Sequence, residues 1–278
     1  MRKLLSANFS RLWKSKIFWL LEAATFSFSA IAYFLVGANV KNMGESWILS
    51  HAEFYFFIVL VYVGVLIAIF SSQFFGTEYS DGTVRNKMVV GHSRKAIYFS
   101  CWLLNAFVTV LFILTHYIVA IIVGIPVGGI AVISVIEQIG LKIACSLIIA
   151  LAYTAIFTMT TLLDSNKARC AVVNILLIML LMIVGFMIFS ALEQPELKYQ
   201  MVLQDDGSYL MHDNIPNPRY VGGSLRIVYT VIESIMPAAF ALRLVSNCFS
   251  SYHIIGCTAL FVLLTAAGMA LFKKKDIK

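Results

Sequence analysis

Residues that could catalyse a reaction or bind a metal are present in this 278-residue chain, but they are scattered along it. His51, Glu53, His212 and His253 lack the close spacing of metal ligands. The five cysteines show neither metal-ligand nor disulfide-framework spacing. No Ser/His/Asp arrangement for nucleophilic catalysis and no G-x-x-x-x-G-K-S/T phosphate loop is evident. We therefore expect no enzyme, no metal site and no cofactor bound by the chain itself.

Two ionisable residues, Glu22 and His116, lie inside long apolar segments. Ionisable groups at such positions are costly and usually functional, and an ion-coupled secondary transporter would need them. No chain of Asp, Glu or His residues links the two, so this class of transporter is kept only as an alternative. We expect Glu22 to reach the membrane interface or a neighbouring hydroxyl, and His116 to be a hydrogen-bonded core residue.

The composition indicates which elements must position all of these groups. Sixty per cent of the residues are hydrophobic and 13% are charged, against roughly 45–50% and about 25% in soluble domains. A helix needs roughly 20 apolar residues to cross a bilayer, and the chain contains six such segments. We therefore predict an all-α integral membrane protein forming one transmembrane domain over residues 1–278. The predicted spans are Ile17–Val36, Phe54–Phe75, Ile97–Ile125, Ile143–Leu163, Cys170–Leu192 and Ile254–Phe272.

The basic residues are distributed unevenly between the two sides of these spans. Fifteen of the 21 Lys and Arg residues, with four acids, lie on the side that holds both termini. The opposite side holds the other six basic residues and nine acids. Because cytoplasmic connections carry an excess of Lys and Arg, we expect both termini to be cytoplasmic and the membrane to be the plasma membrane. The net charge of +7 is then a topology signal that also attracts anionic lipid, and we expect no binding of nucleic acid.

Residues 1–16 predict an amphipathic helix that lies in the cytoplasmic interface. Leu5, Phe9, Leu12 and Trp13 share one face, and basic and polar side chains occupy the other. Such a segment binds a membrane surface and leads into the first span. A frayed basic tail is the alternative.

Residues 193–252 form the longest predicted water-facing segment. Two β-prone runs, 199–204 and 208–212, flank Asp205-Asp206-Gly207, which predicts a hairpin. Apolar helices at 224–236 and 238–247 are separated by Pro237 and are too short to cross the membrane. We expect them to enter the outer leaflet and return, with Glu233 and Pro237 as the functional residues of this re-entrant segment. A helix lying flat on the outer surface is the alternative.

Residues 76–95, between the second and third spans, contain the most informative motif. Asp81 can cap a short helix that runs to Val90, and Gly91 suits the position just after its end. Val84 and Met88 lie four residues apart on one apolar face. A compact helix held parallel to the membrane is suited to docking in a groove of a cytoplasmic partner. A plain basic turn between spans is the alternative.

The order of motifs in this loop resembles the signature region of the type-two ATP-binding-cassette (ABC) permease family. Members have an acidic residue, a Gly-Thr, and a later Ser-Arg before the third span; Ser93 can also cap that span. A proline often found shortly before the Ser-Arg is replaced here by Gly91-His92. The resemblance extends over the whole chain, from the basic amphipathic start to the basic end. The matching residues are Glu78, Gly82-Thr83 and Ser93-Arg94.

The resemblance implies the membrane half of an exporter. Two permease copies, as a homodimer or a related heterodimer, pair with two ATPase subunits, which bind ATP and Mg²⁺. It also implies that the helix around residues 81–90 is the coupling helix, and we expect Glu78 and Arg94 to hold its ends through charge-assisted hydrogen bonds. The expected coupling residues are Glu78, Asp81, Gly82, Thr83, Arg85, Met88, Ser93 and Arg94.

The cargo is predicted less directly. Spans rich in Phe, Tyr, Met and small residues suit an amphipathic or apolar cargo. In its compact size the chain resembles permeases that export antimicrobial or toxin-like peptides. We therefore expect a cargo of this kind. Lipid-linked glycan or drug export is the alternative within the same family.

Overall fold

The computed structural model describes residues 2–43, 51, 53–124, 126, 139–203 and 209–275. Six helices in these ranges are long and apolar enough to cross a membrane. Each coincides with one predicted span to within a few residues, so the prediction of an all-α membrane protein with six spanning helices is confirmed. The helices are Lys16–Asn39, Glu53–Ser80, Arg94–Gly124, Ile139–Leu163, Lys167–Leu192 and Ser251–Lys274.

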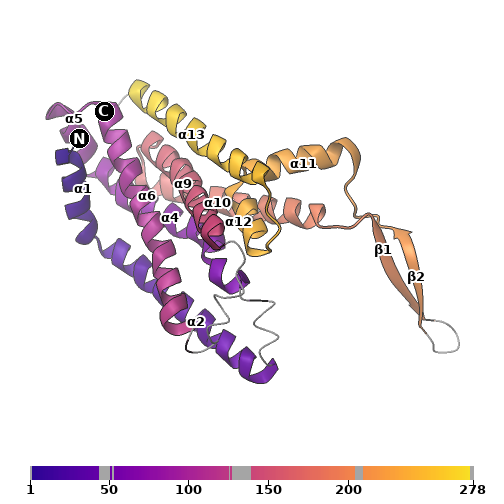
Figure 1. Cartoon of the computed structure of the whole chain (residues 1–278). Helices are drawn as coiled ribbons and strands as arrows, with labels where there is room; N and C mark the ends of the chain where they lie inside the picture. The colour runs from indigo at the N-terminus through magenta and orange to yellow at the C-terminus, as the bar shows by residue number, and fades with distance from the viewer. Residues whose placement is uncertain are drawn as a thin grey trace.

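The elements follow one another along the chain as a helical bundle with one hairpin (Figure 1). The first half contains α1 (Arg2–Trp13), α2 (Lys16–Met43), α4 (Val59–Ser80), α5 (Thr83–Val89), α6 (Arg94–Val119) and a π-helical turn, η1 (Ala120–Gly124). The second half contains α9 (Ile139–Leu163), α10 (Lys167–Leu192), β1 (Leu197–Leu203), β2 (Tyr209–Pro216), α11 (Gly223–Ile235), α12 (Pro237–Val245) and α13 (Ser251–Lys274).

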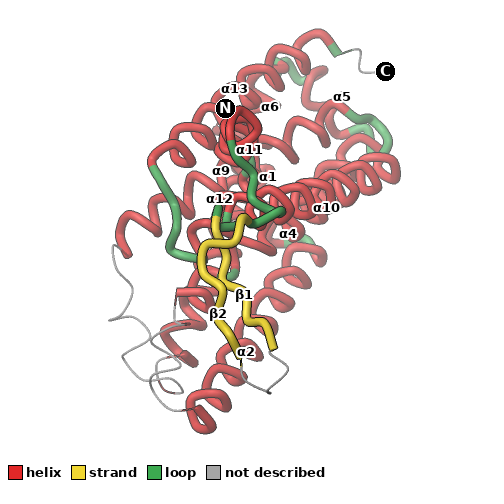
Figure 2. The backbone as a smooth tube through the Cα atoms, turned by 90° about the vertical axis from the view of Figure 1, so that its right-hand side faces the viewer, coloured by secondary structure: helices red, strands yellow, loops and turns green. Residues whose placement is uncertain are grey.

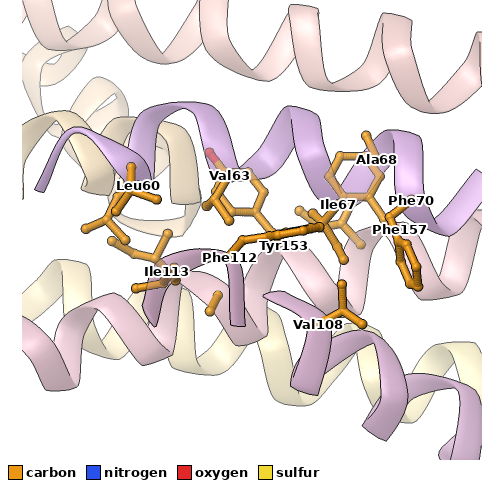
Figure 3. Close-up of a cluster of buried hydrophobic side chains, with 14 of the residues drawn as sticks. Leu60, Val63, Ile67, Ala68, Phe70, Val108, Phe112, Ile113, Tyr153 and Phe157 are labelled. Carbon is orange, nitrogen blue, oxygen red and sulfur yellow. The ribbon is translucent and has the colours of Figure 1, made fainter. Parts of the chain in front are cut away.

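The centre of the bundle is formed by α4, α6 and α9. Leu60 and Ile67 of α4 pack with Phe112 of α6 and Tyr153 of α9, all fully buried (Figure 3). A methyl group at Gly64 would lie 2.8 Å from the Tyr153 ring, so this position needs glycine for α4 and α9 to approach. Because lipid is as apolar as these side chains, close packing of this kind holds membrane helices together.

Hydrogen bonds between buried side chains also join the spanning helices. Asn105 of α6 donates to Ser71 of α4 at 2.8 Å and to Thr158 of α9 at 2.9 Å. Asn174 of α10 donates to the next serine, Ser72, at 2.9 Å. Each such bond contributes roughly 0.6–2 kcal/mol in a membrane. The two asparagines therefore tie three helices to one turn of α4.

Helix α1 lies against the bundle at the end that also holds α5 and both chain termini (Figure 1). Its buried residues are Leu4, Asn8 and Leu12. The predicted apolar face is therefore displaced, because Leu5 is only half-buried and Trp13 is 48% exposed. The sequence pattern missed Asn8 because a polar residue is normally assigned to the water-facing side of such a helix.

The segment after α10 contains the predicted hairpin and the two predicted short helices. β1 and β2 pair antiparallel, with Leu197 opposite Pro216 and Leu203 opposite Tyr209 (Figure 2). The expected turn, residues 205–207, lies outside the described residues. α11 and α12 meet at an angle of 93°, with Pro237 as the first residue of α12. The break at Pro237 is confirmed, and the position of these helices in the outer leaflet stays a prediction.

Candidate functional site

The junction between α4 and α5 is built differently from the sequence prediction. Asp81 is exposed and caps the C-terminus of α4, since its N–H donates to the Thr77 carbonyl at 3.0 Å. The residue before α5 is Gly82, whose φ of 66° is left-handed, and no side chain caps the helix. The prediction that Asp81 caps α5 is therefore wrong. The reason is that α4 continues to Ser80, so the chain must reverse within two residues, which requires glycine.

The end of α5 matches the prediction. Gly91 has a φ of 94°, and its N–H donates to the Met88 carbonyl at 2.9 Å. The N–H of His92 donates to the Lys87 carbonyl at 3.1 Å, which completes a Schellman motif. The Ser93 hydroxyl then accepts from the Ala96 N–H at 3.3 Å and starts α6. The two-residue Gly-His link thus gives α5 a fixed end.

The two sides of α5 differ in exposure. Val84 is buried, and Met88 packs against the bundle core, as their spacing predicted. Arg85, Asn86, Val89 and Val90 are exposed; we call these four residues the α5 outer face. Val89 and Val90 are 79% and 77% exposed. Two exposed valines beside an arginine, at the end of the molecule that holds both termini, form a small apolar surface with one positive charge.

The inner side of this loop is fixed by Glu78, which is fully buried near the end of α4. Both of its carboxylate oxygens accept hydrogen bonds from Lys87 Nζ of α5, at 2.8 and 2.9 Å. Arg11 of α1 donates to the same carboxylate at 2.5 Å and to the Phe74 carbonyl at 2.8 Å. The expectation that Glu78 holds α5 by charge-assisted hydrogen bonds is therefore confirmed, although its partners were not predicted.

Asn8 extends this network to the third span. Its side-chain carbonyl accepts from Lys87 Nζ at 3.0 Å, and its amide donates to the Ser100 hydroxyl of α6 at 3.4 Å. We call Asn8, Arg11, Glu78, Lys87 and Ser100 the Glu78 network. It joins α1, α4, α5 and α6 through one connected set of hydrogen bonds.

Arg94 does not hold α5. Its guanidinium donates to the carbonyls of Lys273, at 3.1 Å, and Lys275, at the end of α13. The expectation that Glu78 and Arg94 clamp the two ends of α5 is thus wrong for Arg94. Arg94 follows the Ser93 cap on α6, and the exposed carbonyls of the last turn of α13 are acceptors that a cation satisfies well.

Lys275 makes a second connection at the same end of the molecule. Its ammonium donates to the Leu162 carbonyl of α9 at 3.0 Å and lies 4.2 Å above the Tyr79 ring of α4. Burial lowers the pKa of Lys275 to about 8, although the negative charge of Asp164 acts to raise this pKa. The last helix is therefore tied to both α6 and α9 beside the Glu78 network.

A second charged cluster surrounds the break between α11 and α12. Glu233 is fully buried and accepts from Arg243 Nε at 2.7 Å. Arg243 also pairs with Glu193 at the end of α10, and His253 Nε2 of α13 lies 3.4 Å from the second Glu233 oxygen. Glu233, one of the two residues selected from the sequence, thus lies in a cluster that also joins α10 and α13, and the other, Pro237, begins α12 at the break. Arg243 and His253 were missed as its members because their spacing carries no motif.

An apolar cavity of about 330 Å³ lies between α4, α10 and α12. Its lining contains no polar side chain, and it includes Met182, Phe186 and Met187 of α10 and Leu242 of α12. Phe186 and Met187 are also exposed on the outside of the bundle, at 60% and 64%. The cavity is therefore suited to alkyl or aromatic groups and not to sugars.

The two ionisable residues inside spans are both hydrogen-bonded. His116 is fully buried, with Nε2 donating to the Tyr55 carbonyl at 3.1 Å and Nδ1 lying 2.7 Å from the Ser29 hydroxyl. Glu22 accepts from the Thr115 hydroxyl at 2.9 Å. Both expectations are confirmed, and within the described residues no Asp, Glu or His relay connects the two. This arrangement does not favour an ion-coupled transporter.

Comparison with known families agrees with this geometry. A family model described as "ABC-2 family transporter protein" matches residues 4–185, which is more than half of the chain and runs from α1 into α10. No curated protein matches the chain. Among the residues that the structure describes, no group of three His, Cys, Asp or Glu side chains is placed to hold a metal ion.

Proposed function

The chain belongs to the ABC-2 transporter family, and on that premise we propose that it is the permease subunit of an exporter whose α5 receives the movement of a separate ATPase. The permease class and the existence of an ATPase partner follow from the family. The direction of transport, the cargo, the coupling residues and the dimer are our proposals.

The observation that carries the coupling proposal is the contrast between the two sides of α5. The inner side is fixed to α1, α4 and α6 by the Glu78 network. The α5 outer face exposes Arg85 and two valines. A rigid element that is exposed on one side can transmit a partner's displacement to the helices behind it. Closure of the ATPase would then move α4 and α6, the second and third spans.

We propose that α5 and both termini face the cytoplasm of the cell and that the protein lies in the plasma membrane. The uneven distribution of Lys and Arg supports this orientation. The hairpin and the Glu233 cluster would then lie at the outer end, with α11 and α12 entering the outer leaflet.

We propose that two permease copies pair and that cargo passes between them. The apolar cavity supports this arrangement, because residues of its α10 wall are also exposed on the outside of the bundle. Its methionines can adapt to different apolar shapes. An amphipathic cargo, such as an antimicrobial or toxin-like peptide, fits this lining, whereas a glycan would find no polar partner in it.

The proposal is tested by measuring ATP hydrolysis with and without an ATPase partner. The purified permease alone should show no vanadate-sensitive hydrolysis, and hydrolysis should appear when the ATPase subunit is added to the reconstituted permease. The matched control is the same ATPase added to empty liposomes. Robust vanadate-sensitive hydrolysis by this chain alone would reject the division of labour.

A further inference from the structure

A groove of about 430 Å³ lies where the turn between α1 and α2 meets α6, away from the α4–α10–α12 cavity. Trp13, Trp19 and Phe26 form much of its wall, and Glu22 and Thr115 supply its polar atoms. The three aromatic side chains are 48%, 53% and 54% exposed, so the groove opens on the outside of the bundle.

Glu22 is a carboxylate in this groove that forms no ion pair with a Lys, Arg or His in the part of the chain that the structure describes. Its carboxylate accepts a hydrogen bond from the neutral Thr115 hydroxyl at 2.9 Å, and none of the ion pairs among the described residues includes it. A carboxylate within a span is costly unless a cation or several donors accompany it. The groove therefore presents one negative group that lacks a cationic partner.

The aromatic side of the groove is held in a fixed arrangement. Trp19 Nε1 donates to the Trp13 carbonyl at 2.9 Å, and the two indole rings lie 5.9 Å apart. Phe18 packs edge-on against both rings, at 5.7 and 5.2 Å. Indole faces attract ammonium groups, and aromatic cages recognise quaternary ammonium ligands in this way.

We propose that this groove binds a cationic amphiphile, with its ammonium group paired to Glu22 against Trp13 and Trp19 and its alkyl chain along Phe26 and the lipid. The charge of Glu22, the indole walls and the apolar remainder of the groove each match one part of such a molecule. The proposal goes beyond the proposed function, because binding requires neither an ATPase nor transport.

The order of charges along α2 favours a singly charged cation over a zwitterionic phospholipid. Lys14 precedes α2 and Lys16 is its first residue, and Glu22 lies six residues beyond Lys16, about 9 Å further along the helix at 1.5 Å per residue. A zwitterionic phospholipid carries its phosphate closer to the acyl chains than its ammonium group. That order would place phosphate beside Glu22 and ammonium beside the lysines, so the phospholipid is the poorer match.

The test uses the purified permease in phosphatidylcholine nanodiscs and a dodecyltrimethylammonium probe brominated in its chain. Two of the four tryptophans line the groove, so binding should quench their fluorescence saturably. Glu22→Gln should weaken binding about tenfold, the effect expected for loss of a charge-assisted contact. Ala23→Leu, which fills the groove without changing its charge, should weaken binding as well. Glu196→Gln, at an exposed site near the hairpin, should bind like the wild type.

A brominated dodecyl sulfate of the same chain length separates charge recognition from simple partitioning. The proposal expects this anionic probe to quench without saturation. Thermal unfolding checks that the Glu22→Gln variant is folded. Two results would overturn the proposal by showing only a lipid-facing surface: equal affinity for both probes, or wild-type affinity in the folded Glu22→Gln variant. Because no ATPase is present, either result leaves the proposed function untouched.

Discussion

Glu78 shows what a single residue contributes and what the sequence can say about it. Its acidic type and its position before Gly82-Thr83 made it a candidate from the sequence. Its partners were not predictable, because Arg11 lies 67 residues away and no local pattern indicates which helix α1 will pack against. The same limit applies to Arg94, whose acceptors lie at the end of α13. Sequence spacing locates such residues, and only the packing of helices determines their partners.

We predict that Glu78→Gln lowers the free energy of unfolding by about 3 kcal/mol, because the Lys87 ammonium, whose side chain is only 11% exposed, loses its charged partner. This loss is near the lower end of the range of about 3–5 kcal/mol for breaking buried ion pairs. The reason is that the side chain of Arg11, the other cation of the network, is 35% exposed to solvent. Chemical unfolding in mixed micelles measures it. The control is Asp164→Asn, which removes an ion pair with the 67%-exposed Arg169 and should cost less than about 1 kcal/mol. Equal losses in the two variants would contradict the role of the network.

At the scale of elements, the sequence was most informative where a feature is local. The six spans were predictable because a long apolar run is itself the physical requirement for crossing a bilayer. The end of α5 at Gly91 and the start of α6 at Ser93 were predictable, because each depends on one residue type in one conformation. The Asp81 cap failed because α4 runs to Ser80 and places Asp81 at its own end. The boundary between two adjacent helices depends on how far the first one extends. The cap preference of a single residue does not determine this.

We predict that Gly91→Ala destabilises the C-terminal end of α5 without affecting membrane insertion. A Cβ at Gly91 would meet no atom within 4 Å, so the cost comes only from the φ of 94°. For a residue other than glycine this strain is of order 1–3 kcal/mol. Amide hydrogen exchange should therefore become faster in residues 83–92. Gly140→Ala, where a Cβ also meets no atom within 4 Å, is the control, and unchanged exchange in Gly91→Ala would exclude a fixed α5 end.

The whole molecule has two different ends. α5 lies at the end that holds both termini, together with the Glu78 network bonded to it, and the hairpin extends from the bundle beyond α10 and α11 (Figure 1). The arrangement of helices agrees with the uneven distribution of basic residues, because α5, α1 and the end of α13 carry many of them.

We predict that a cysteine at Val89 is cytoplasmic and that a cysteine at Arg219 is external, in a variant whose five native cysteines have been removed. Both positions are exposed, so a membrane-impermeant thiol reagent can reach either one from its own side. In intact cells the reagent should label only position 219, and opened cells should allow labelling at position 89. The reverse pattern would invert the topology and separate α5 from a cytoplasmic ATPase.

If the α5 outer face transmits ATPase movement, reversing its one positive charge should reduce that transmission. Arg85→Glu changes an exposed residue of that face, whereas Arg219→Glu makes the same change at the other end of the molecule. The measurement is ATP turnover per assembled complex, with the amount of complex determined in the same reconstituted preparation. We predict that Arg85→Glu lowers turnover roughly tenfold, because it places a repulsive charge at a docking surface, while Arg219→Glu remains at the wild-type value. Normal turnover and normal assembly in Arg85→Glu would contradict the claim.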